Sequence, residues 1–128
     1  LSYRTDLWGA AFIMNGGCSD DGFDYFRGWL ISQGQQVFDA ALEHPDSLAK
    51  VVPKDPEDYS YELEEMLSIG QDVWREKTGL KNEDYYKQLG KFEPYPPLGE
   101  FEWSDGEGDI DEDKGKRLYP KLWKKFEW

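Results

Sequence analysis

The chain of 128 residues is acidic, rich in aromatic side chains and of the usual size for one domain. It carries 27 acidic and 15 basic residues, so its net charge of −12 argues against binding to nucleic acid or to an anionic membrane surface. The longest apolar stretch, Ala10–Met14, is far shorter than the ~20 residues that cross a bilayer. A lone cysteine and the lack of a signal-peptide pattern make the cytoplasm the expected location. No motif indicates a cofactor.

The first fifty residues carry apolar side chains at helical spacing. They predict a first helix over Thr5–Met14, with Thr5 or Asp6 as its N-cap and Asn15-Gly16-Gly17 as its end. A third helix is predicted over Gln35–Glu43, and Pro45 starts a short helical turn after it.

A second helix lies between these two. Ser19 or Asp20 is its expected N-cap, and Gly34 breaks the run that follows. Phe23, Phe26 and Leu30 share one face of this helix, and Trp29 and Ile31 widen it. We expect the aromatic face made by Phe23, Phe26, Trp29 and Leu30 to lie in the core.

The middle of the chain is predicted to hold two more helices. A charged, proline-marked connector at Lys54–Asp58 precedes the strongest periodic signal, which predicts a helix over Leu63–Trp74. A short helix over Asn82–Leu89 is expected to follow.

The charge of the chain reverses sign near its end. Residues 93–113 hold nine acids and no base, and we expect an extended, partly flexible segment there. Residues 114–128 hold six bases and one acid. In that stretch Leu118, Leu122 and Phe126, spaced i, i+4, i+8, predict one short amphipathic helix that closes the domain.

Together these patterns predict an all-α fold: an irregular bundle of five or six helices with an extended acidic segment and a packed C-terminal aromatic tail. We expect one helical domain over residues 1–128. Because a helical pattern begins within a few residues of Leu1, we also expect a further N-terminal helical segment to precede it.

The turn between the first two helices is the stretch richest in candidate functional groups. Cys18, Ser19, Asp20 and Asp21 stand at a helix start, where a small ligand or a metal ion can bind. The alternative is structural, since Ser and Asp side chains at such a position cap backbone N–H groups. We favour the structural interpretation.

The same two alternatives apply to the neighbouring reactive and charged residues. Cys18 at a helix start could be a nucleophile, but adjacent carboxylates raise a thiol pKa, and the only histidine, His44, lies a full helix away and is expected to be a helix cap. Arg27 could contact an anionic ligand, but an arginine in this position more often pairs with an acid such as Asp24.

The triplet Asp109-x-Asp111-x-Asp113 has the spacing of the first ligands in a calcium loop. The glycine falls one position late, at Gly115, and Pro120 stands where the bidentate Glu belongs. We therefore expect a solvated acidic linker rather than a calcium site.

Several motifs resemble the bacterial domain-of-unknown-function family 4240, and they are spread over most of the chain. They are Trp8-Gly9-Ala10-Ala11, the turn from Gly16 to Phe23, Phe26-Arg27-x-Trp29-Leu30-Ile31, Pro45-Asp46-Ser47-Leu48-Ala49 and Tyr119-Pro120-x-Leu122-Trp123. The resemblance implies a further helical segment before Trp8. It implies no activity, because the family has none established.

Two functions remain open at this point. The first is a non-catalytic interaction or binding module with a protein partner, favoured because no base, nucleophile and orienting group stand together. The second is a metal-dependent or small-ligand-binding enzyme, with its site at Ser19-Asp20-Asp21 and further ligands from Asp24 or from Glu64 and Glu65. The sequence does not indicate an oligomeric state.

Overall fold

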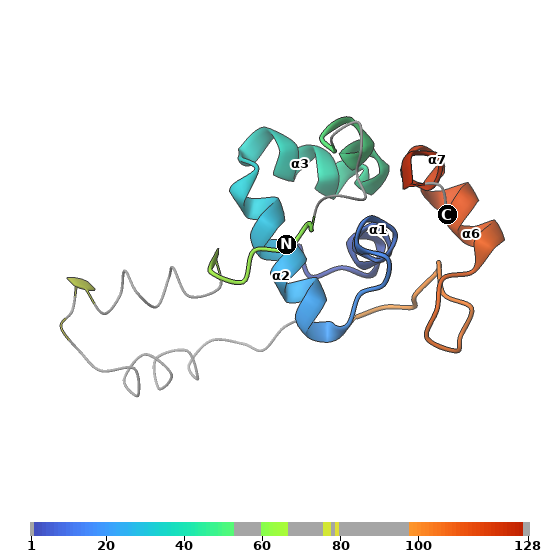
Figure 1. Cartoon of the computed structure of the whole chain (residues 1–128), viewed down its shortest axis with the longest axis horizontal. Helices are drawn as coiled ribbons and strands as arrows, with labels where there is room; N and C mark the ends of the chain where they lie inside the picture. Colours follow the sequence, from blue (N-terminus) through green and yellow to red (C-terminus); the bar gives the residue numbers. More distant parts are fainter. Residues whose placement is uncertain (1, 53–59, 67–75, 78, 80–97, 127–128) are drawn as a thin grey trace.

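The computed structural model describes residues 2–52, 60–66, 76–77, 79 and 98–126 (Figure 1). Within these residues the chain forms six helices: α1 (Thr5–Asn15), α2 (Asp20–Ser32), α3 (Gln35–Glu43), the 3₁₀ helix η1 (Pro45–Lys50), α6 (Glu112–Leu118) and α7 (Pro120–Phe126). The described residues hold no strand, only an isolated bridge between Ser104 and Ile110. The predicted all-α fold is therefore confirmed.

Two of the predicted helices, over Leu63–Trp74 and Asn82–Leu89, lie mostly or wholly outside the described residues, as does the connector at Lys54–Asp58. No helix in the described part of the chain is long and apolar enough to cross a membrane.

Helix α1 is the central element of the described fold. It contacts α2, η1 and α7, and in Figure 1 it lies between α2 on one side and the pair α6–α7 on the other. Its buried residues point in all directions around the helix axis: Leu7, Trp8, Gly9, Ala10, Ala11, Ile13 and Met14. A helix that is apolar all round is a buried helix, which explains its place in the middle of the bundle.

The corner between α1 and α2 is set by short-range backbone chemistry. Gly16 ends α1 in the left-handed conformation, with φ of 69°, and its N–H donates to the Phe12 carbonyl. Ser19 caps α2 by accepting a hydrogen bond from the Gly22 N–H at 3.2 Å. Both predicted boundaries are confirmed.

The predicted N-cap of the first helix is wrong by one residue. Arg4 holds the N-cap position, without a side-chain capping bond, and Thr5 is already helical. Asp6 lies in the first turn, where its carboxylate pairs with the Arg4 guanidinium and accepts from the Leu7 N–H at 2.8 Å. The carboxylate thus neutralises a cation and the positive helix end without occupying the cap.

The aromatic face of α2 lies in the core, as predicted. Phe23, Phe26 and Leu30 are fully buried, and the Trp8 ring stacks on Phe23 with centroids 4.6 Å apart. The face is narrower than predicted, because Trp29 is only partly buried and Ile31 is 51% exposed.

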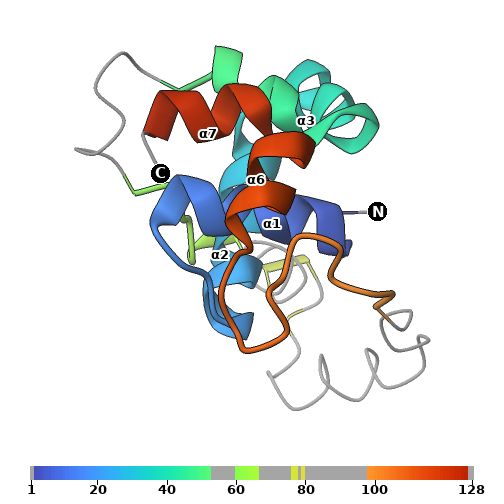
Figure 2. The same cartoon turned by 90° about the vertical axis from the view of Figure 1, so that its right-hand side faces the viewer.

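The C-terminal tail packs on the bundle, as predicted, but as two helices instead of one (Figure 2). Tyr119 separates α6 from α7 with a non-helical conformation, φ −131° and ψ 56°. Pro120 explains the break, because proline disfavours helical backbone in the residue before it and lacks an N–H. Tyr119, Leu122 and Trp123 are nevertheless buried.

The acidic segment is more structured than the sequence indicates. Glu112 and Asp113 belong to α6, and Asp111 caps that helix by accepting from the Lys114 N–H at 2.9 Å. Residues 103–111 form a closed turn in which Trp103 and Ile110 are buried. Within the predicted 93–113 segment, residues 103–111 therefore form an irregular turn that two apolar side chains anchor.

Candidate functional site

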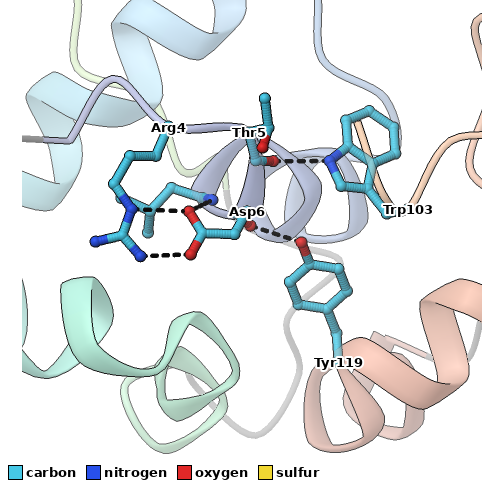
Figure 3. A network of polar contacts seen from close by, with 6 residues as sticks. Arg4, Thr5, Asp6, Trp103 and Tyr119 are labelled. Carbon is cyan, nitrogen blue, oxygen red and sulfur yellow. Dashed lines mark hydrogen bonds and ion pairs between the residues drawn. The ribbon is translucent and has the colours of Figure 1, made fainter. Parts of the chain in front are cut away.

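Two aromatic side chains from the end of the chain meet the first turn of α1 (Figure 3). The Trp103 Nε1–H donates to the Thr5 carbonyl at 2.7 Å, and the Tyr119 hydroxyl donates to the Asp6 carbonyl at 2.7 Å. Burial, with a smaller contribution from the Asp6 carboxylate, raises the pKa of Tyr119, so its hydroxyl stays a donor. These two bonds fix the end of the chain against its beginning.

Gly9 makes this close approach sterically feasible. A Cβ at Gly9 would lie 2.2 Å from the Tyr119 hydroxyl oxygen and 2.6 Å from Trp103 Cδ1. The glycine sits one turn after Thr5, on the side of α1 where both rings pack. A larger residue would hold the two aromatic side chains away from the helix.

Asp46 of η1 anchors α7 on the other side of the tail. Its carboxylate accepts from the Lys121 and Leu122 N–H groups at 3.1 and 2.9 Å, which are unpaired donors at the start of a helix. The Lys125 ammonium donates to the Ala49 carbonyl at 2.9 Å. The tail is therefore held at both α1 and η1.

A cleft of about 320 Å³ lies where these elements meet. Its lining comes from α1, the α3–η1 junction and the tail: Thr5, Asp6, Glu43, His44, Pro45, Glu102, Trp103, Leu118 and Tyr119. We call this the α1 cleft. Its volume is at the low end of the range of about 300–1,000 Å³ typical of ligand pockets. An adjoining hollow of about 520 Å³ shares Thr5, Asp6 and Glu102 with it.

The α1 cleft combines apolar walls with negative charge. Trp103, Tyr119 and Leu118 form much of the wall. Glu43 and Glu102 are exposed and form no ion pair with any other described residue, whereas Asp6 is paired with Arg4. No three His, Cys, Asp or Glu side chains in the described ranges are grouped so that they could hold a metal ion. The arrangement suits an organic cation, whose charge the carboxylates neutralise and whose apolar part can lie along Leu118.

The residues predicted from the sequence as candidate ligands lie at another place, around the start of α2. Ser19 is the cap already described, and Asp20 and Asp21 are exposed in the first turn of α2. Burial, with contributions from the Glu62, Asp20 and Asp24 carboxylates, raises the pKa of Cys18 to about 12. A thiol with that pKa holds almost no thiolate at neutral pH, so it is a poor nucleophile.

Arg27 is held by side chains of the protein itself. Its guanidinium donates to Asp24 at 3.1 Å and to the Ser2 hydroxyl at 2.9 Å, and it lies 5.1 Å from the centre of the Tyr3 ring. The predicted pairing with Asp24 is therefore present. The structure brings Cys18, Asp20 and Asp24 near one another, but it places none of the predicted site residues in the α1 cleft.

No local pattern in the sequence predicts the α1 cleft. His44 was interpreted as a helix cap, and its backbone does hold the C-cap position of α3, while its side chain lines the cleft. Glu43, Glu102 and Tyr119 come from segments far apart in the chain, and no local pattern joins them. Three motifs of the resemblance contain residues of this region: Trp8-Gly9, Pro45-Asp46 and Tyr119-Pro120.

Comparison with known proteins places the chain in a family but gives it no activity. A family model described as a protein of unknown function, DUF4240, matches residues 1–76, which is more than half of the 128 residues. No curated protein matches the chain, and no solved structure does. The matched stretch contains α1, α2, α3 and η1, whereas α6 and α7, which complete the α1 cleft, lie after it. The chain belongs to the DUF4240 family.

Proposed function

We propose that this protein is a non-catalytic binding module of the cytoplasm, which recognises a basic side chain of a protein partner in the α1 cleft. The observation that carries the proposal is the composition of the cleft. Two carboxylates without a cationic partner among the described residues, Glu43 and Glu102, stand beside a wall that contains Trp103 and Tyr119.

Arginine is the side chain that fits these walls best. Its guanidinium is planar and carries five N–H donors, so it can pair with two carboxylates at once. A cleft of about 320 Å³ has room for one arginine side chain. The net charge of −12 also raises the rate at which a basic partner meets this surface.

The alternative function, an enzyme with its site at the start of α2, has less support. Ser19 is engaged in capping, and the raised pKa of Cys18 works against a nucleophilic role. Asp20 and Asp21 are not among the residues that line the α1 cleft.

A titration with capped tripeptides tests the proposal. The ligand is N-acetyl-Gly-Arg-Gly-amide, and the control peptide carries citrulline, which keeps the shape of arginine but lacks its charge. We expect millimolar binding of the arginine peptide and much weaker binding of the citrulline peptide. Equal binding of the two peptides would contradict the proposal.

Matched charge variants locate the site. The cleft variant replaces Glu43→Gln and Glu102→Gln, and the control variant replaces Asp20→Asn and Asp21→Asn, so both remove two negative charges. Two exposed ion pairs contribute together about 1 kcal/mol, so the cleft variant should bind the arginine peptide about fivefold more weakly. The control variant should stay within twofold of the wild type, and an equal loss in both variants would refute the assignment of the site.

A further inference from the structure

Most of α6 and all of α7 carry a charge opposite in sign to that of the whole protein, whereas α6 begins with the exposed acids Glu112 and Asp113. Residues 114–126 contain six bases and no acid, in a chain whose net charge is −12. The apolar residues of this stretch face the bundle: Leu122 and Trp123 are buried, and Leu118 and Phe126 are partly buried. Four of its six basic residues are exposed: Lys116, Arg117, Lys121 and Lys124. The two helices lie at one edge of the bundle in Figure 1 and face the viewer in Figure 2.

Half of these six bases have partners within the fold. Lys114 donates to the Ser104 carbonyl at 2.9 Å, Lys125 donates to the Ala49 carbonyl, and Lys116 pairs with Glu112. The two carbonyl contacts hold the tail in place, and the Glu112 carboxylate offsets the charge of Lys116.

The other three bases are exposed and form no ion pair with a described residue: Arg117, Lys121 and Lys124. We call them the basic ridge. Lys121 and Lys124 are three residues apart in α7 and thus share one face, and Arg117 lies in the last turn of α6, directly before the junction. The Asp46 carboxylate at the start of α7 accepts hydrogen bonds from the Lys121 and Leu122 N–H groups and forms no ion pair with the Lys121 side chain.

We propose that the basic ridge is a docking surface for an acidic segment of a protein partner. Charge complementarity supports this occupant, because three cations without internal partners on one edge attract and orient carboxylates. A nucleic acid fits less well, because three cations are a small footprint for a surface that must contact many phosphates. The proposal stands independently of the α1 cleft, whose charge has the opposite sign.

The test uses the full chain and a fluorescein-labelled, N-acetylated hexaglutamate peptide, with binding followed by fluorescence anisotropy at low salt. The ridge variant replaces Arg117→Gln, Lys121→Gln and Lys124→Gln. The control variant replaces Lys77→Gln, Lys81→Gln and Lys87→Gln, so its net charge changes by the same three units. The ridge variant should melt close to the wild type, since none of the three ridge side chains is buried, and the melting temperature of the control variant is measured beside it.

We expect saturable binding that is about tenfold weaker in the ridge variant and within twofold of wild type in the control, because three exposed ion pairs act together. Raised salt should weaken wild-type binding, since exposed charges are screened. Absence of binding by the wild type, or an equal loss in both variants, would overturn the proposal. Tighter binding of a single-stranded oligonucleotide than of hexaglutamate would also overturn it, in favour of a nucleic-acid surface. Each of these results leaves the arginine-peptide test of the α1 cleft unaffected.

Discussion

Replacing Gly9→Ala tests whether the tail is docked on α1 as described. The added Cβ would lie 2.2 Å from the Tyr119 hydroxyl, 2.7 Å from its Cζ and 2.6 Å from Trp103 Cδ1, so both rings must move. Overpacking of this kind costs about 1–3 kcal/mol, and displacement of the hydroxyl from the Asp6 carbonyl costs about 1 kcal/mol more. The intrinsic preference of alanine for helices returns about 1 kcal/mol. We expect a net loss of about 1–3 kcal/mol.

The measurement is thermal and urea unfolding followed by circular dichroism. For a chain of this size, each kcal/mol lowers the Tm by about 3–5 °C. The control is Gly99→Ala, whose Cβ meets nothing within 4 Å and which should change stability by less than about 0.5 kcal/mol. Adding Tyr119→Phe to Gly9→Ala should recover part of the loss, since it removes the closest atom. If Gly9→Ala alone is at least as stable as the wild type, no steric clash offsets the higher helix propensity of alanine. That result would show that the rings of Trp103 and Tyr119 do not pack at Gly9.

Four further outcomes are expected. Phe26→Ala should lose about 3–5 kcal/mol of unfolding free energy because the ring is fully buried, whereas Ile31→Ala, half exposed, should lose much less; similar Tm values for the two would mean that the phase of α2 is wrong. Deletion of residues 117–128 should lower the Tm strongly and should do so almost equally at low and high salt, because burial dominates over charge; an unchanged melt would identify a detached tail. Iodoacetamide should modify Cys18 very slowly at pH 8 and faster as the pH rises from 10 to 12, because the raised pKa keeps the thiol protonated until then. The urea-unfolded chain should react at an ordinary rate at pH 8. Equal rates for the folded and unfolded chains at pH 8 would contradict the burial of the thiol. Calorimetry should detect no micromolar, stoichiometric binding of calcium to residues 100–113, because carboxylates in this turn already accept backbone N–H groups; such binding would show that they rearrange.

Features that depend on neighbouring residues could be predicted from the sequence. Gly16 ends α1 because a left-handed cap favours glycine, and Ser19 caps α2 because its hydroxyl reaches the Gly22 N–H. The third helix over Gln35–Glu43 was predicted with its observed bounds. In each case the determining atoms lie within four residues of the boundary.

In the C-terminal tail, the periodicity of the apolar residues predicts one helix, but the effect of a proline on the backbone decides the structure. Leu118, Leu122 and Phe126 follow helical spacing, yet Pro120 between them prevents a continuous helix. In the acidic segment, the abundance of carboxylates favours an extended conformation as the prediction. The burial of Trp103 and Ile110, only two side chains, decides its conformation.

The α1 cleft could not be predicted, because it depends on contacts between the two ends of the chain. Trp103 is 98 residues from its acceptor Thr5, and Tyr119 is 113 residues from Asp6. No periodicity or motif spacing encodes pairings over such distances. The residues that line the α1 cleft include Glu, His and Tyr side chains with no distinctive spacing in the sequence. They share a site only because the fold brings them together.

The most direct test of the central proposal is the ¹H–¹⁵N NMR spectrum of the protein during addition of N-acetyl-Gly-Arg-Gly-amide. The indole N–H of Trp103 donates to Thr5 at the edge of the cleft, so its signal reports on an occupant, whereas Trp29 does not line the cleft and serves as an internal reference. We predict that the Trp103 indole signal shifts progressively and saturates, that the Trp29 indole signal stays in place, and that the citrulline peptide moves neither. A Trp103 signal that is unchanged at saturating peptide, or shifts spread evenly over all indoles, would contradict recognition of a basic side chain in the α1 cleft.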